Sequence, residues 1–371
     1  MKTYIPEKLP IENLNNEKLT VLLDDASSYL CRYDGFLQNM LNPNILLSPL
    51  LRKEAEFSSR IEGTQSTTSE VLEYEAGKKF DKNKQKEVNV IRNYRYALIE
   101  AENYIAEGKP FSLSLLKQIH HTLMKDARWD GKNSKPGEFR NGPVHIGHYE
   151  CKPEEATYIP PEHFLVVEYL ENWEYYFKSY TQQNRLIKAA IIHAQFEIIH
   201  PFEDGNGRIG RMLITLFLHL SGIIKKPSFY ISEYFEKNRT EYYYRLNEIS
   251  KSKDWQGWIE FFLKAVKEQS RNNIKKTIRI STLYNEMKDK FQEATRSQHL
   301  VSALDLFFKR PILSSKIFYE KTKIHRATAY VLLNKLCEKG LIKCLSKGKG
   351  HRPSIYVLPS LINLIEDKDI F

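Results

Sequence analysis

The sequence has little of what marks secreted, fibrous or membrane-spanning proteins. Its 371 residues include only four cysteines, without a C-x-x-C pair, whereas secreted disulfide frameworks are denser. Glycine and proline number 16 and 15, too few for a fibrous chain. The longest apolar run, 212–224, contains polar residues and is too short to cross a bilayer. With no signal-peptide pattern at the start, the sequence predicts a cytoplasmic protein without membrane contact.

Positive charge is concentrated at one end of the chain. The net charge is +10, yet residues 1–270 hold 36 basic and 37 acidic side chains. Residues 271–371 hold 20 basic and 9 acidic side chains and so carry the whole excess. A basic module on a neutral body favours contact with nucleic acid. A solvated basic surface without a partner is the alternative.

Apolar periodicity predicts a mainly helical protein of two or three domains. A helix is expected to follow Ser48 and Pro49, an N-cap and first-turn signal, and to stop at Gly63. The segment 128–161 is rich in helix breakers and predicts an irregular loop with a small hairpin. The further predicted helices span 66–104 (one or two helices), 111–124, 161–180, 184–199, 206–220, 242–250 and 255–270.

The segment between the helices 184–199 and 206–220 carries the strongest chemical signal. It reads His-Pro-Phe-Glu-Asp-Gly-Asn-Gly-Arg-Ile-Gly-Arg over residues 200–211. Pro201 ends the first helix near His200. Gly205, Asn206 and Gly207 form a tight turn whose bare N–H groups, with the positive end of the next helix, make an anion site.

The charged residues of this segment suit a nucleotide polyphosphate. Arg208 and Arg211 share a helix face, and paired guanidinium groups suit phosphate oxygens. Asp204 beside the turn could hold Mg²⁺, and His200 is a candidate general base. Taken singly, a histidine, a glycine turn or a pair of arginines of this kind more often has a structural role than a functional one. A zinc site using His193 and His200 is a weaker alternative, because no third ligand has the required spacing.

All eight specified positions of the signature H-P-F-x-x-G-N-G-R-x-x-R are present, and the sequence therefore resembles the Fic-domain proteins. The resemblance covers roughly residues 40–265. It implies a mostly helical Fic fold, with a small β-hairpin flap, that transfers AMP from ATP to a hydroxyl of a target protein. The flap, expected near 143–160, would dock the target as an added strand.

The resemblance assigns a role to each motif position. His200 would take the proton from the attacking hydroxyl, Asp204 would hold Mg²⁺, and Phe202 would anchor the loop. Gln195 and Tyr243 are weaker candidates for nucleotide contact. The residues implied in nucleotide binding are Glu62, Gln195, Gly205, Asn206, Gly207, Arg208, Ile209, Gly210, Arg211 and Tyr243.

An upstream segment resembles the inhibitory pattern of the same family, S/T-x-x-x-E-G/N. Ser58, Glu62 and Gly63 fill its specified positions, and the first two lie one helical turn apart. The resemblance implies that Glu62 pairs with Arg211, removes a contact to the γ-phosphate and so inhibits the enzyme. A simple helix-capping arrangement is the structural alternative.

The basic C-terminal region resembles a winged helix in its order of elements. Residues 299–358 predict helix, turn, helix and a hairpin. The second helix would enter the major groove of DNA, with Lys347, Lys349 and Arg352 near phosphates. Winged helices also bind proteins, so the kind of partner stays open.

The sequence therefore predicts a regulated adenylyltransferase that uses ATP and Mg²⁺. The expected units are an N-terminal helical region with the inhibitory motif (1–110), a Fic catalytic domain (111–270), a linker helix (271–298) and a winged-helix-like domain (299–371). A homodimer is expected by analogy with the family. A nucleotide-sensing transcription regulator, or transfer of another group on the same fold, are the alternatives.

Overall fold

The computed structural model describes residues 3–12, 14–40, 42–127, 134–147, 155–179, 183–349 and 352–371. In this part of the chain the structure is mainly helical, as predicted, with one small three-stranded sheet near the C-terminus. Over the same ranges no helix is both long and apolar enough to cross a membrane.

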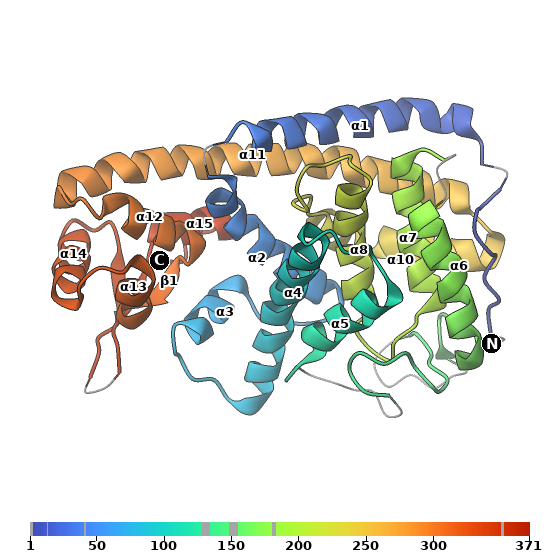
Figure 1. Cartoon of the computed structure of the whole chain (residues 1–371), viewed down its shortest axis with the longest axis horizontal. Coiled ribbons are helices and arrows are strands. Elements are labelled where there is room, and N and C mark those ends of the chain that lie inside the picture. The colour runs from blue at the N-terminus through green and yellow to red at the C-terminus, as the bar shows by residue number, and fades with distance from the viewer. Residues whose placement is uncertain are drawn as a thin grey trace.

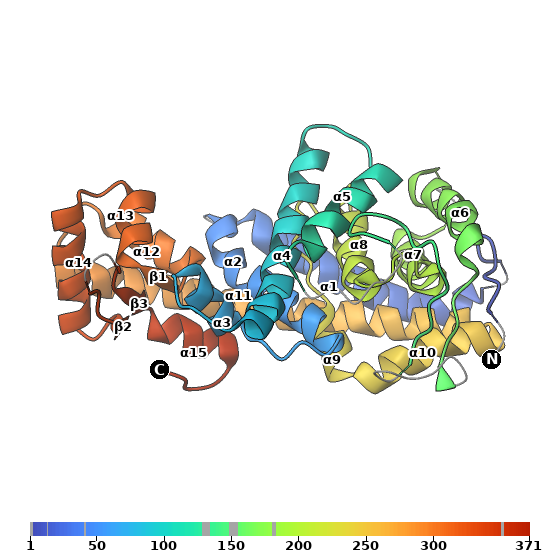
Figure 2. The same ribbon diagram turned by 90° about the horizontal axis from the view of Figure 1, so that it is seen from below.

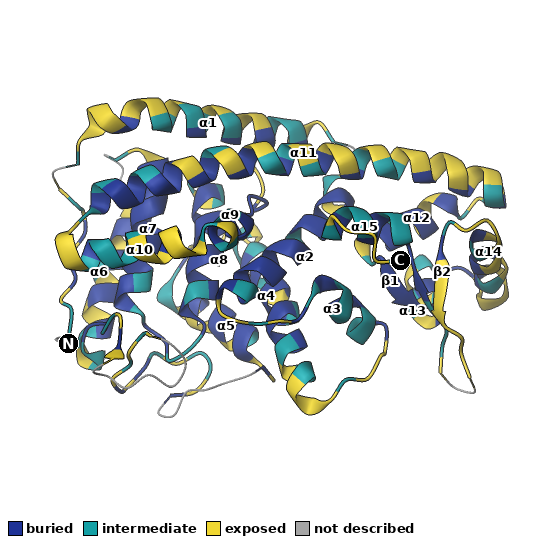
Figure 3. Cartoon of the chain, turned by 180° about the vertical axis from the view of Figure 1, so that it is seen from behind, coloured by how far each residue is buried: buried dark blue, intermediate teal, exposed yellow. Residues whose placement is uncertain are grey.

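The helices of the first 299 residues surround a shared apolar core, shown dark blue in Figure 3. Their bounds are α1 (Asn16–Gln38), α2 (Pro43–Ile61), α3 (Thr68–Glu75), α4 (Lys82–Ala106), α5 (Leu113–Met124), the 3-10 helix η2 (His163–Leu165), α6 (Val166–Ser179), α7 (Arg185–Ile199), α8 (Asn206–Leu220), α9 (Ser232–Lys237), α10 (Arg239–Ser252) and α11 (Trp255–Thr295).

Helix α11 is a spine that runs the length of the molecule (Figure 1). It begins where the Asp254 side chain accepts from the Gly257 N–H at 2.8 Å, an N-cap. The predicted helix 255–270 continues without a break for 41 residues to Thr295. Helix α1 packs alongside its first half, and the C-terminal elements pack against its far end. One helix therefore contacts both halves of the protein.

Helices α7 and α8 form the centre of the helical core, at almost the predicted bounds. Nearly all of α7 is buried, and two tryptophans close this core. The Trp173 and Trp258 indoles donate at 2.9 Å to the backbone carbonyls of Ile192 and Ala190 in α7. Because buried indole N–H groups need a partner, these bonds fix α6 and α11 against α7. The 200–211 segment is thereby held between two rigid helices.

Helix α2 begins earlier than predicted. It starts at Pro43, so Pro49 lies inside the helix, and Ser48 donates to the Lys309 carbonyl at 3.1 Å instead of capping. A proline inside a helix removes one backbone hydrogen bond, but packing against α4, α9 and α12 outweighs this loss. The predicted end is correct, because Gly63 has φ +93°. Helix α2 lies between the two ends of the molecule (Figure 2).

The C-terminal elements follow the predicted order of helix, turn, helix and hairpin. A further strand, β1, pairs antiparallel with β3, so the sheet order is β1-β3-β2. The exposed residues Lys347, Lys349 and Arg352 lie around the hairpin tip. The bounds are α12 (Leu300–Lys309), β1 (Ile312–Ser314), α13 (Ser315–Thr322), α14 (Arg326–Glu338), β2 (Lys343–Ser346), β3 (Ile355–Val357) and α15 (Pro359–Glu366).

Candidate active site

His200 occupies the C-cap of α7. Its φ is 49°, and its N–H donates to the Phe196 carbonyl at 3.0 Å. Its Nδ1 lies 3.3 Å from the Glu197 carbonyl. Since a carbonyl only accepts, Nδ1 carries the proton and Nε2 keeps its lone pair. Burial and the Arg140 charge lower the pKa of His200 to about 4. The imidazole is therefore neutral at pH 7, and its Nε2 is unprotonated.

The turn after His200 is closed by its own side chains. The Asn206 amide accepts from the Phe202 N–H at 2.9 Å and donates to the Phe202 carbonyl at 2.7 Å. Gly205 has φ +82°, the left-handed region that favours glycine. Phe202 is fully buried, as expected for the loop anchor. The first N–H groups of α8 are thus held in a fixed turn, where they can bind an anion.

His120, which the sequence analysis did not single out, packs against the turn. The His120 ring stacks on Phe202 with centroids 3.7 Å apart. Its Nδ1 accepts from the Gly137 N–H at 2.8 Å, and its Nε2 donates to the Asp204 carbonyl at 2.9 Å. Burial lowers the pKa of His120 to about 3. The ring is neutral, as these two bonds require, and links α5 to the turn.

Arg140 was also missed, and it holds the segments around His200 together. Its Nε donates to the His200 carbonyl at 2.8 Å, and its other nitrogens donate to the carbonyls of Gly142 and Pro161. Its own N–H donates to the Pro201 carbonyl at 2.9 Å. These contacts span up to 61 residues along the chain, so no local pattern predicts them.

The two motif arginines lie on α8 and have different partners. Arg208 donates to Asp204 at 2.8 Å, one turn back along the chain. Arg211 is completely buried and donates to groups on α2 instead. Its Nε donates to the Ser58 hydroxyl at 3.0 Å, and its Nη2 donates to the Ser58 carbonyl at 2.7 Å. The Arg211 side chain is therefore positioned by Ser58 of α2.

Glu62 completes this contact at the C-cap of α2. Its carboxylate accepts from Arg211 Nη2 at 2.7 Å, which is the predicted pair. A Cβ added at Gly207 would collide with Glu62 Oε1, so the carboxylate lies directly over the start of α8. Burial alone would raise the pKa of Glu62, but the Arg211 and Arg208 charges hold it below its usual range. The Glu62 carboxylate therefore occupies the place at the start of α8 where an anion could bind.

Glu197 is a partly buried residue near this pair that the sequence did not single out, and its Oε1 atom is buried. A Cβ added at Gly210 would collide with its Oε1, and this atom has no hydrogen-bond partner among the described residues. Burial raises the pKa of Glu197 to about 8, although Arg211 opposes the shift. The group is therefore largely protonated at pH 7, and the single negative charge opposite Arg211 belongs to Glu62.

The two weaker nucleotide candidates lie in different places. Tyr243 donates to the Ile61 carbonyl at 3.3 Å and so contacts the end of α2 beside Glu62. Gln195 lies on the opposite side of α7 from His193 and Glu197, since residues two apart differ by about 200° around a helix. Its amide donates to the Glu7 carbonyl at 2.8 Å. The structure thus brings Tyr243, and not Gln195, to the end of α2 beside Glu62.

His193, the second ligand of the alternative zinc site, lies in an aromatic environment. Its ring nitrogen is within hydrogen-bond distance of the Tyr242 hydroxyl, at 2.9 Å, and the ring stacks near Phe235 and Trp258.

The predicted flap hairpin has its base in an antiparallel bridge between Ile146 and Tyr158. The rest of the flap, 148–154, lies outside the described residues.

Two family models match the chain. The one described as Fic/DOC family N-terminal matches residues 20–103, and the one described as Fic/DOC family matches residues 110–218. Together they cover more than half of the sequence, including α2 and the whole 200–211 motif. The chain belongs to the Fic/DOC family.

Two curated relatives match a smaller part of the chain than the family models do. A probable protein adenylyltransferase, aq_aa38 of Aquifex aeolicus, is 28% identical over 121 residues, which are 33% of this chain and 34% of that protein. Protein adenylyltransferase fic-1 of Caenorhabditis briggsae is 30% identical over 122 residues, 29% of this chain and 22% of that protein. The match thus spans about a third or less of these relatives.

One solved structure resembles the chain over nearly its full length. It is a Fic family protein from Desulfovibrio desulfuricans, with a TM-score of 0.60 and 20% identity, covering 95% of this chain and 98% of that one. A fragment of Fic-1 from Caenorhabditis elegans has a TM-score of 0.54 over 70% of this chain and 74% of that one, at 18% identity. These similarities establish the fold.

The position of Glu62 predicts that Gly207→Ala is destabilising mainly because of this carboxylate, which the new Cβ would meet more closely than it meets Arg211 Nη1 at 2.9 Å. The added methyl group would cost about 1–3 kcal/mol, and most of that cost is expected to vanish when Glu62→Gly removes the carboxylate. Thermal unfolding of the two single variants and the double variant measures this coupling.

Gly210→Ala is the matched control on the same helix, because its methyl group meets Glu197 instead. Its cost is expected to be the same with and without Glu62. Equal costs of Gly207→Ala in both backgrounds would mean that Glu62 does not lie over α8 in solution.

Proposed function

We propose that the protein transfers AMP from ATP to a Ser, Thr or Tyr hydroxyl of a target protein. The observation that carries this proposal is the juxtaposition of a neutral His200 with the anion site at the start of α8, where the Glu62 carboxylate lies. Phosphate groups of ATP would bind where this carboxylate now sits. The adenylyltransferase names of the relatives support the same reaction.

In the proposed reaction the substrate hydroxyl attacks the α-phosphorus of ATP. The new O–P bond forms as the bond from the α-phosphorus to the bridging oxygen breaks, and pyrophosphate leaves. His200 Nε2 takes the hydroxyl proton. The N–H groups of Gly205, Asn206 and Gly207 and the guanidinium of Arg208 stabilise the phosphate charge, the main task of such a site.

Asp204 is the residue that would hold Mg²⁺. Its carboxylate is 30% exposed beside the turn and already contacts Arg208. Among the described residues no group of three or more His, Cys, Asp or Glu could form a metal cage. A single carboxylate fits Mg²⁺, which commonly keeps its waters and takes further oxygens from substrate phosphates. When bound, the ion would neutralise phosphate charge.

Glu62 inhibits this reaction in the proposal. Arg211 can meet either the Glu62 carboxylate or the γ-phosphate, because both are anions that require the same guanidinium. Ser58 holds Arg211 in the first arrangement through two hydrogen bonds. Productive binding of ATP would require Glu62 to move away.

The target protein would dock at the flap. The paired backbone at Ile146 and Tyr158 lies at its base, and a target segment would add as a strand. A homodimer and a cytoplasmic location stay predictions.

Removal of Glu62 is expected to release the activity. Glu62→Gly, incubated with Mg²⁺ and ATP, should gain an AMP-sized mass adduct on itself or on an added target at least about ten times faster than the wild type. That factor corresponds to about 1.4 kcal/mol of restraint. Adding His200→Ala should abolish the gain. Intact-mass spectrometry follows all three proteins.

Glu107→Gly is the matched control. Glu107 is also a C-cap glutamate followed by glycine, at the end of α4, and its partner is the exposed Lys109. It should behave like the wild type. Equal transfer by the wild type and Glu62→Gly would contradict inhibition by Glu62, and an adduct that survives His200→Ala would contradict its role as the base.

We also propose that the C-terminal module contacts nucleic acid. His325, Arg326 and Thr328 are exposed in the first turn of α14 and just before it, and the basic hairpin tip is exposed as well. This arrangement fits a recognition helix with phosphate contacts beside it.

The salt dependence of DNA binding tests this proposal. For a random DNA duplex, replacing Lys347, Lys349 and Arg352 by glutamine should reduce the slope of log K against log salt by about one for each phosphate that is no longer neutralised. The control replaces the exposed Lys18, Lys79 and Lys82, which lie outside the module. An unchanged slope, or the same reduction in the control, would contradict the proposal.

A further inference from the structure

A cavity lies where helix α2 meets the C-terminal module. Its volume is about 350 Å³, near the lower end of the range for small-molecule sites. The N-terminal half of α2, helix α4, the segment 226–230 and the end of α12 form its walls. Five of its lining residues are cationic and one is acidic: Arg52, Arg95, Lys226, Lys309, Arg310 and Glu102.

The three arginines of this cavity share a single carboxylate. Glu75 lies 2.7 Å from Arg95, 3.4 Å from Arg52 and 3.8 Å from Arg310. One negative charge cannot neutralise three positive charges. Burial and the like charges of Arg95 and Arg310 lower the pKa of Arg52 to about 9, although Glu75 opposes this shift. The cluster keeps a positive excess at pH 7.

The remaining groups do little to reduce this excess. Arg52 is 5% exposed, and its Nε has no hydrogen-bond partner in the part of the chain that the structure describes. Lys226 donates to the neutral amide of Asn44 at 3.0 Å. Burial raises the pKa of Glu102, although His219 and Lys226 oppose the rise. Buried cations without matched carboxylates are costly, and an anion in the cavity would stabilise them.

We propose that this cavity binds a small phosphate-bearing anion, no larger than a mononucleotide, between α2 and the C-terminal module. The guanidinium groups of Arg52, Arg95 and Arg310 would contact the phosphate oxygens, with Lys226 at the opening. Apolar side chains of Leu47, Leu51, Ile99 and Pro227 line the same cavity and would pack against the organic part.

The same helix joins this cavity to the active site. Arg52 and Glu62 are ten residues apart on α2, about 15 Å along a rigid helix. Ser48 and Arg52 both donate to the Lys309 carbonyl, and Lys53 pairs with Glu366 at 2.9 Å. These contacts bind α2 to the C-terminal module.

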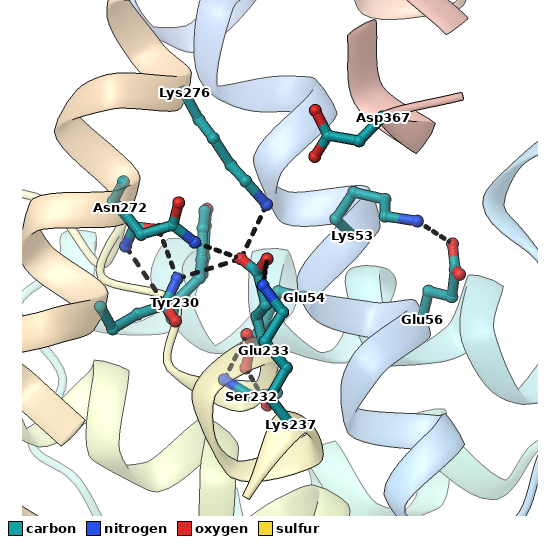
Figure 4. Close-up of polar contacts among 12 residues, drawn as sticks. Lys53, Glu54, Glu56, Tyr230, Ser232, Glu233, Lys237, Asn272, Lys276 and Asp367 are labelled. Carbon is teal, nitrogen blue, oxygen red and sulfur yellow. Dashed lines mark hydrogen bonds and ion pairs between the residues drawn. The ribbon is translucent and has the colours of Figure 1, made fainter. Parts of the chain in front are cut away.

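Helix α2 is also held on its other side. Figure 4 shows that Glu54 of α2 accepts hydrogen bonds from Ser232, the first residue of α9. The next residue of α9, Glu233, pairs with Lys276 of α11 at 2.7 Å. An anion that joins Arg52 to Arg310 therefore stabilises the arrangement in which Glu62 contacts Arg211. This consequence, unlike the binding itself, rests on the proposed inhibition by Glu62.

Calorimetric titration with pyrophosphate tests the binding. The active site also binds phosphates, so the titration uses Arg208→Gln as background to weaken that site. One binding event should remain in this background. Adding Lys226→Gln and Arg310→Gln, two partly or fully exposed positions, should weaken it at least about tenfold, since charged hydrogen bonds contribute about 1.5–3 kcal/mol each.

The matched control adds Lys335→Gln and Lys339→Gln instead, which removes two exposed charges at the end of α14. It should bind pyrophosphate like the background. The proposal is overturned if no binding event remains in the background, or if both pairs of substitutions weaken it equally. Titrations with inorganic phosphate and AMP then report whether the organic part adds affinity.

Hydrogen–deuterium exchange of residues 58–63 tests the link to α2 without using AMP transfer. Pyrophosphate should slow exchange there in the Arg208→Gln background, and not after Lys226→Gln and Arg310→Gln. Binding of pyrophosphate without slower exchange would support the anion site but overturn its link to inhibition. Because neither readout measures catalysis, failure of the AMP-transfer proposal is detected separately.

Discussion

The ion pair between Glu62 and Arg211 is the contact on which the rest of this structure depends. It joins residues 149 positions apart and closes the C-terminal end of α2 onto the N-terminal part of α8. Arg211 is fully buried, and such a guanidinium requires acceptors. Ser58 and Glu62 supply them. Residues 58–62 therefore stabilise the same arginine that, in the proposal, they withhold from a phosphate, so the proposed inhibition would be a property of the folded state.

Helix α2, which ends at this contact, joins the two ends of the molecule. Helix α2 packs against the catalytic helices at one end and against the C-terminal module at the other. Helix α11 supports both halves, so α2 can shift only against a fixed frame. In the proposal, a ligand that replaces some of the polar contacts of α2 would shift the helix between arrangements with and without the Glu62–Arg211 pair. The distribution of buried charge along α2 suits that role.

The local chemistry of the site could be predicted from the sequence, because the motif is contiguous. His200, the turn and both arginines lie within twelve residues, from the end of α7 into the start of α8. The pair of Glu62 and Arg211 also follows from the sequence, but only through the resemblance to a family. The start of α2 was wrong because Pro49 is a strong local signal that tertiary packing overrides.

Other parts could not be predicted because their partners are distant in the chain. Arg140 and His120 look like ordinary residues of a loop and a helix until the fold brings them against 200–204. The protonated state of Glu197 depends on burial, which a local pattern does not report. The three arginines around Glu75 come from α2, α4 and the residue after α12. Such sites arise from the packing of elements.

The relative affinity for ATP and ADP tests the central claim most directly, because the two nucleotides differ in the γ-phosphate that Arg211 would bind. In the wild type, where Glu62 occupies Arg211, the two affinities should be within about twofold of each other. In Glu62→Gly, ATP should bind at least about tenfold more tightly than ADP, a difference of about 1.4 kcal/mol. Adding Arg211→Gln should remove that preference. The same ATP-to-ADP ratio in the wild type and in Glu62→Gly would contradict the account.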